Sequence, residues 1–141
     1  MAIVLSCYSS NAGKTIRKNK TIYVLDNGIA NALLRLPVID ETRAGVIVQG
    51  ICARDALAAC ESNLWSLHYW RDKSFEVDLV LNRKTSILPV EVKYRSQKRK
   101  TAIPAFRQAF ADSNIPASVV ITKDFLAKEG TILHIPFWLA R

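Results

Sequence analysis

The sequence lacks a disulfide framework. Its 141 residues include three cysteines, an odd number, and no two of them form the Cys-x-x-Cys pair of a structural zinc site. Cys7, Cys52 and Cys60 are therefore predicted to be reduced, buried thiols. Small disulfide-rich scaffolds and zinc ribbons are excluded.

Long apolar runs are also absent. No stretch approaches the ~18 consecutive apolar residues that a membrane helix requires. The N-terminal decapeptide MAIVLSCYSS is too short for a secretory signal peptide, and it lacks the basic residues with which such a signal begins. From these absences we expect a cytoplasmic protein without membrane association.

Acidic residues are few. Asp and Glu number 12 against 20 Lys and Arg, which gives a formal net charge of +8. A basic surface attracts polyanions, chiefly nucleic acid or acidic membrane. Hydrophobic residues make up 50% of the chain and charged residues 23%, so we expect one globular domain over residues 1–141.

The spacing of apolar residues predicts an α/β fold. Residues 1–20 are interpreted as a basic N-terminal segment, followed by a strand from residue 21 and a short helix that ends before Pro37. Helical spacing covers residues 44–63. Three strands follow at 64–70, 75–81 and 87–94, then a helix near Pro104 and two strands within 117–124 and 130–139. The core over 44–135 is thus predicted to be a mixed central sheet flanked by helices.

The strands FEVDLVL (75–81) and ILPVEVKY (87–94) are predicted to form a hairpin around Lys84 and Thr85. That register places residue 78 opposite 91 and residue 76 opposite 93, and opposed residues share a face. One face is then apolar, with Val77, Leu79, Leu81, Leu88, Val90 and Val92. The other face carries Glu76, Asp78, Glu91 and Lys93.

Asp78 and Glu91 are like charges predicted to lie directly across two strands. Such a pair destabilises a sheet by roughly 0.2–1 kcal/mol. Lys93, on the same face, offsets part of this cost, and a divalent cation would offset more, since Mg²⁺ binds one or two carboxylates together with water and phosphate oxygens. The alternative is a solvated strand face with an ordinary ion pair.

An Asp on the second strand of a meander, followed by Glu-x-Lys on the third, resembles the PD-(D/E)XK nuclease superfamily. The resemblance implies a restriction-endonuclease-like sandwich and a DNA nuclease that uses Mg²⁺ or Mn²⁺. It implies that Asp78, Glu91 and Lys93 are catalytic. It also implies that Asp78, Glu91 and the backbone carbonyl of Val92 bind the metal, with Lys93 assisting attack by water.

A closer resemblance covers nearly the whole chain. The segments KTIYVLDNGIANAL, YWRDKSFEVDLVL, LPVEVKY, VVITKD and ILHIPFWL are similar to a C-terminal domain of unknown function that follows an AAA-type ATPase module in archaeal and bacterial proteins. A separate AAA-type ATPase is therefore a candidate partner. The chain departs from the family pattern in the helix, where AGVIVQG places Gln49 at the usual glutamate. Gln49 or Glu76 is a further candidate metal ligand.

A basic run follows the Glu-x-Lys strand. Arg95, Lys98, Arg99 and Lys100 in YRSQKRK are candidate phosphate contacts, against the alternative of a solvated loop. Gln108, on the next helix, is a candidate contact to nucleic acid by resemblance. The apolar tail IPFWLA (135–140) either closes the core or forms a homodimer interface.

Two functions remain open from sequence. The first is a metal-dependent DNA nuclease that uses Asp78, Glu91 and Lys93. The second is a nuclease-fold domain whose site has decayed and which binds nucleic acid or protein. Gln49 is the residue that favours the second, because a neutral amide binds a hard cation more weakly than a carboxylate does.

Overall fold

The computed structural model describes residues 2–9, 19–24, 26–33, 40–96 and 100–140, and the structural statements below refer to these. The elements in chain order are β1 (Ala2–Leu5), β2 (Thr21–Val24), α2 (Asn27–Leu33), α3 (Glu41–Asn63), β3 (Ser66–Asp72), β4 (Phe75–Asn82), β5 (Ile87–Lys93), α4 (Ile103–Ala109), β6 (Ser118–Thr122), β7 (Ala127–Glu129), β8 (Ile132–Pro136) and a 3₁₀ turn at Phe137–Leu139.

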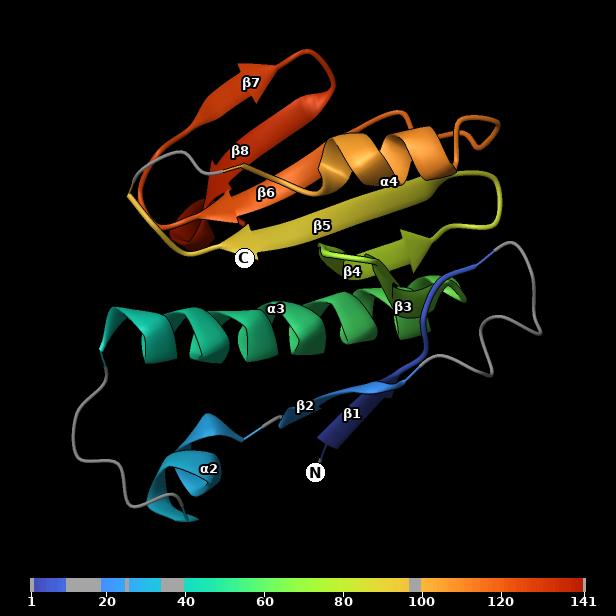
Figure 1. The fold of residues 1–141 in the computed structure, drawn as a ribbon. Coiled ribbons are helices and arrows are strands. Elements are labelled where there is room, and N and C mark those ends of the chain that lie inside the picture. Colours follow the sequence, from blue (N-terminus) through green and yellow to red (C-terminus); the bar gives the residue numbers. More distant parts are fainter. Residues whose placement is uncertain (1, 10–18, 25, 34–39, 97–99, 141) are drawn as a thin grey trace.

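A six-stranded sheet forms the centre of the molecule, in the order β3-β4-β5-β6-β8-β7. Strands β3, β4 and β5 form an antiparallel meander, whereas β6 lies parallel to both β5 and β8. Helix α3 covers one face of the sheet and α4 covers the other (Figure 1). The predicted mixed α/β sheet flanked by helices is confirmed. Strand β7, which pairs with β8 at the sheet edge, was not predicted, because its three residues are too short for an alternating pattern.

Helix α3 carries one side of the site described below. It begins three residues earlier than predicted, since Asp40 caps its first turn by accepting a hydrogen bond from the backbone N–H of Arg43 at 2.7 Å. The helix ends where Leu64 adopts a left-handed conformation with φ 56°. Its buried residues include Val48, Ala53 and Cys60, which pack on the sheet.

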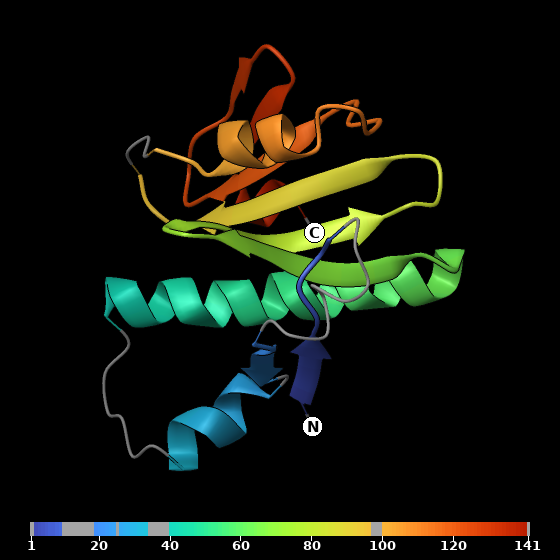
Figure 2. The same ribbon diagram turned by 45° about the vertical axis from the view of Figure 1, so that its right-hand side comes forward.

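The N-terminal segment differs from the basic segment that the sequence predicted. Strand β1 pairs antiparallel with β2, and Ile3, Leu5 and Cys7 are buried in the core. Figure 2 shows β1, β2 and α2 on the side of α3 away from the sheet. Strand β1 has only four residues, which is too short for an alternating pattern to stand out in the sequence.

Two core clusters show which strand residues face which helix. Leu79 and Leu81 pack with Ala53 of α3. Val77 and Val80 pack with Phe106 of α4 on the opposite face. The prediction that Val77 shares a face with Leu79 is therefore wrong. The register of β3 and β4 shifts between the pairs His68–Val80 and Trp70–Val77, and this bulge interrupts the alternation of side chains.

The remaining sequence expectations concern cysteines and membrane helices. Cys7 and Cys60 are buried, as predicted, whereas Cys52 is only half-buried, and none of the three is part of a disulfide among the described residues. In the part of the chain that the structure describes, no helix combines the length and apolarity needed to cross a bilayer.

Candidate functional site

The hairpin of β4 and β5 opens at one end, and the candidate site lies there. The predicted register is confirmed where the ladder forms, from Leu79 opposite Val90 to Asn82 opposite Ile87. Continuing it past Leu79 would place residue 77 opposite Val92. Instead, the backbone N–H of Val92 donates to the side chain of Asp78, so a carboxylate takes a position that a main-chain carbonyl would hold in a continuous ladder.

Both carboxylate oxygens of Asp78 accept hydrogen bonds from the protein. Oδ2 accepts the hydrogen bond from the N–H of Val92 at 2.7 Å, and Oδ1 accepts one from the side-chain amide Nε2 of Gln49 at 3.0 Å. Gln49 comes from α3, so Asp78 links the opened strand pair to this helix. The hydroxyl of Tyr23 on β2 also donates to the main-chain carbonyl of Asp78, at 3.4 Å.

Glu91 is buried, and both of its carboxylate oxygens also have partners within the protein. Its side chain is 1% exposed. Oε2 accepts a hydrogen bond from the backbone N–H of Ala102 at 2.8 Å, just before α4, and Oε1 forms an ion pair with Nζ of Lys93 at 2.7 Å. These two partners explain how a carboxylate is tolerated in the core, where an unpaired charge would be costly.

The surroundings of Asp78 raise its pKa to about 7. Burial is the main cause, because it penalises the charged form, and the negative charges of Glu91 and Glu76 add to it. The hydrogen bond from Val92 and the positive charge of Lys93 act in the opposite direction. Asp78 is therefore the titratable group of this site whose charge state changes near neutral pH.

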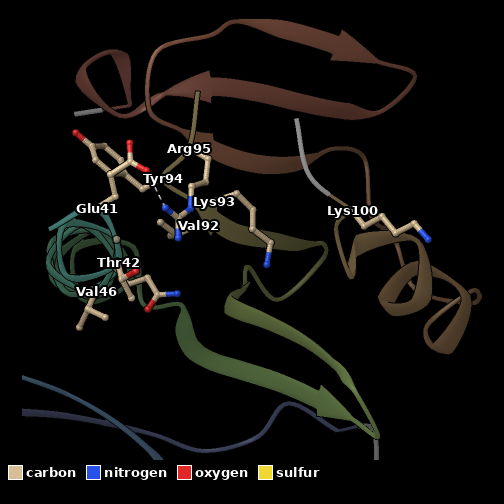
Figure 3. Close-up of a pocket in the computed structure, with 10 residues that line it drawn as sticks. Glu41, Thr42, Val46, Val92, Lys93, Tyr94, Arg95 and Lys100 are labelled. Carbon is tan, nitrogen blue, oxygen red and sulfur yellow. Dashed lines mark hydrogen bonds and ion pairs between the residues drawn. The ribbon is translucent and has the colours of Figure 1, made fainter. Parts of the chain in front are cut away.

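A groove of about 630 Å³ lies beside these carboxylates, between the first turns of α3 and the end of β5. Figure 3 shows α3 on one side and Val92 to Arg95 on the other. Lys93, Arg95 and Lys100 are its cationic residues, and Glu41 is the acidic residue that lines it. Arg95 is paired with Glu41, whereas Lys100 makes no ion pair with any described residue. The groove therefore presents positive charge next to a buried acidic site.

The structure brings only some of the predicted site residues together. Asp78, Val92 and Gln49 are joined by hydrogen bonds at the open end of the hairpin, and Glu91 pairs with Lys93 nearby. Gln49 reaches Asp78 from α3, whereas the N–H of Ala102 reaches Glu91 from the side of α4, so the two carboxylates do not share the one face that the sequence predicted. Glu76 instead pairs with Arg71 on β3. Gln108 is exposed near the end of α4, far along that helix from Ala102, and does not line the groove. Lys98 and Arg99 lie outside the described residues.

Sequence reasoning missed three groups at this site. Glu41, at the start of α3, forms ion pairs with both Arg95 and Lys123. Lys123 directly follows β6. Because β5 and β6 are parallel, their carboxyl ends meet at one edge of the sheet, and this topology is the feature that could have placed Lys123 beside Arg95. The N–H of Ala102 gave no signal, because a backbone donor has no sequence signature.

A divalent cation at this site would depend on Asp78, Glu91, the carbonyl of Val92 and the side chain of Gln49. The two carboxylates supply four oxygens, and each oxygen accepts a hydrogen bond or ion pair from the protein itself. Gln49 presents its NH₂ group, not its carbonyl, toward Asp78. Across the described ranges, no three His, Cys, Asp or Glu side chains are grouped as a metal site.

One family model matches the chain, over residues 44–138, which span α3 to the 3₁₀ turn. It describes a domain of unknown function, DUF4143, that often follows AAA-type ATPase modules. No curated protein and no solved structure matches. The resemblance to the ATPase-associated domain is thereby confirmed over residues 44–138, which are more than half of the sequence, whereas the segment KTIYVLDNGIANAL lies outside the match. The chain belongs to the DUF4143 family.

Proposed function

We propose that the chain is a nucleic-acid-binding domain of the restriction-endonuclease-like type, whose acidic site is closed by hydrogen bonds and does not hold a metal. One observation carries the proposal: all four oxygens of Asp78 and Glu91 are bonded by the protein beside a groove lined by Lys93, Arg95 and Lys100. A hard cation needs oxygen lone pairs directed at one point. Asp78 is bonded from the side of α3 and Glu91 from the side of α4, so their oxygens are not directed at one cation.

The two carboxylates are bonded from different sides of the sheet. Asp78 is bonded by Gln49 of α3, whereas Glu91 is bonded by the N–H of Ala102 before α4. Gln49 thus gives Asp78 a hydrogen-bond donor at a position where the family pattern has a glutamate. This arrangement supports the second of the two functions left open by the sequence.

Binding of nucleic acid is supported by charge and position. The net charge of +8 favours polyanions in general, and the groove places cations where adjacent strands end. Lys100 is unpaired among the described residues, so its charge is available to a phosphate without breaking an internal contact. The preferred ligand is therefore a phosphodiester backbone.

Replacing Lys100 with alanine is expected to weaken binding of a single-stranded oligonucleotide by roughly twofold to fivefold. One lost phosphate contact also reduces the slope of log affinity against log salt by about 0.7. Fluorescence anisotropy titrations over a salt series measure both quantities. The matched control is Lys128→Ala, which removes the same charge from exposed strand β7, outside the groove. Equal weakening by both variants would show that only net charge matters.

A metal-dependent nuclease is the second candidate. One observation favours it: burial, with the charges of Glu91 and Glu76, raises the pKa of Asp78 to about 7, and a bound cation would stabilise the charged form of this carboxyl. Cleavage of DNA in Mg²⁺ or Mn²⁺ that is lost in both Asp78→Ala and Lys93→Ala would establish this candidate and overturn the first.

A further inference from the structure

Two cations lie side by side where β5 and β6 end, and one of them, Arg95, lines the groove. Arg95 follows β5 and Lys123 follows β6, and these neighbouring strands are parallel. The backbone N–H of Lys123 donates to the carbonyl of Arg95 at 3.2 Å, so the two residues are fixed next to each other. The carboxyl ends of adjacent parallel strands are a common place for ligands in α/β folds.

The carboxylate of Glu41 bridges these two cations. Nη1 of Arg95 lies 3.0 Å from Oε2, and Nζ of Lys123 lies 3.2 Å from Oε1. Figure 3 shows Glu41 reaching from the first turn of α3 toward Arg95. Hydrogen bonds from Lys123, followed by its charge and by Arg95, lower the pKa of Glu41, so this carboxylate is ionised at neutral pH.

We infer that Arg95 and Lys123 form a phosphate-binding subsite for nucleic acid, and that Glu41 occupies this subsite in the free protein. The inference rests on the proposed function and names a residue that regulates it. A carboxylate and a phosphodiester each offer two oxygens to two cations, and charge-assisted bonds to either are similar in kind. Glu41 therefore competes directly with a backbone phosphate.

Displacement of Glu41 is feasible because the contacts are at the surface. The side chain of Glu41 is 65% exposed, and those of Arg95 and Lys123 are 39% and 37% exposed. Exposed ion pairs are weak and are screened by salt. A nucleic acid already held by Lys100 and Lys93 would place further phosphates near this pair, which raises their local concentration.

The test compares Glu41→Gln with Glu61→Gln. Both variants remove one negative charge from an exposed position of α3, but Glu61 lies at the far end of the helix from the groove. Anisotropy titrations of a labelled single-stranded oligonucleotide are expected to show roughly threefold to tenfold tighter binding by Glu41→Gln than by Glu61→Gln. Its salt slope is expected to steepen by about 0.7 for each additional phosphate that the variant neutralises. Equal affinities and slopes would overturn the inference.

A second pair of variants distinguishes an effect on affinity at the Arg95–Lys123 subsite from an effect of the protein's net charge. Lys123→Gln is expected to weaken binding less in the wild type than in the Glu41→Gln background, because Glu41 occupies Lys123 in the wild type. In the Glu41→Gln background the same change is expected to remove most of the increase in affinity. Equal effects of Lys123→Gln in both backgrounds would contradict competition by Glu41.

Failure of this inference is distinguishable from failure of the proposed function. If no variant binds the oligonucleotide, both are wrong. If the wild type binds and depends on Lys100, but Glu41→Gln behaves as Glu61→Gln, only the inference is wrong. Circular dichroism of Glu41→Gln is the check that α3 is intact, and we expect no change because the variant retains the Asp40 cap.

Discussion

Replacing Gln49 with glutamate is expected to make the stability of the folded protein depend on divalent cations. The change removes the donor that lies 3.0 Å from Oδ1 of Asp78 and places a second carboxylate against it. Loss of this hydrogen bond and the new repulsion should lower the free energy of unfolding by about 1–3 kcal/mol without metal. For a chain of this size, each kcal/mol lowers the melting temperature by roughly 2–4 °C.

Added Mg²⁺ or Mn²⁺ is expected to restore the stability of Gln49→Glu. A ligand that binds only the folded state stabilises it by about 2.7 kcal/mol when present at 100 times its dissociation constant. Thermal melts in EDTA and in MnCl₂ measure the effect, and the wild type should show no such difference. Gln108→Glu is the control, because it makes the same chemical change at an exposed position of α4. A variant that melts like the wild type in EDTA would mean that the contact between Gln49 and Asp78 contributes little.

The second large effect is a dependence of stability on pH that comes from Asp78. The folded pKa is about 7, against an ordinary value of 3.8. Between these values the folded protein keeps a proton that the unfolded chain releases, so the free energy of unfolding falls as pH rises through this window. At about 1.4 kcal/mol per pH unit, the upper bound is roughly 4 kcal/mol. The destabilisation is absent below the window and complete above it.

Asp78→Asn is expected to remove this dependence. An asparagine stays neutral, accepts from the N–H of Val92 through its carbonyl, and donates to Gln49 once the amide of Gln49 turns over. Urea unfolding near pH 5 and pH 8 should show the variant gaining stability relative to the wild type by a few kcal/mol between the two conditions. Parallel pH profiles for the two proteins would show that Asp78 is ionised in the fold at neutral pH.

The elements of the fold that could be predicted from the sequence are those in which apolar residues recur at regular spacing. Helix α3, strands β3 to β6 and the register of Leu79 with Val90 all follow from apolar spacing and from a short turn. Strand β1 was missed because four residues are too few for an alternating pattern to stand out. The bulge that sends Val77 to the other face was missed because alternation assumes an uninterrupted ladder.

The candidate site was predicted in its members but not in its bonding. Gln49 does bond Asp78 and Lys93 does pair with Glu91, but the two carboxylates are bonded from different sides of the sheet, and their predicted roles stay predictions. The donors that hold the carboxylates were not predictable, since two of them are backbone N–H groups of Val92 and Ala102. Every residue type has such groups except proline, so only the three-dimensional arrangement identifies them.

The most direct test of a closed, metal-free binding site is to follow one labelled single-stranded DNA with the wild-type protein, first in EDTA and then in excess Mg²⁺. Anisotropy reports binding, and a denaturing gel of the same samples reports whether the strand is intact. We predict binding in EDTA, an affinity that Mg²⁺ changes only through ionic strength, and an intact strand in both conditions. Binding that requires Mg²⁺, or cleavage that disappears in Asp78→Ala, would contradict this account.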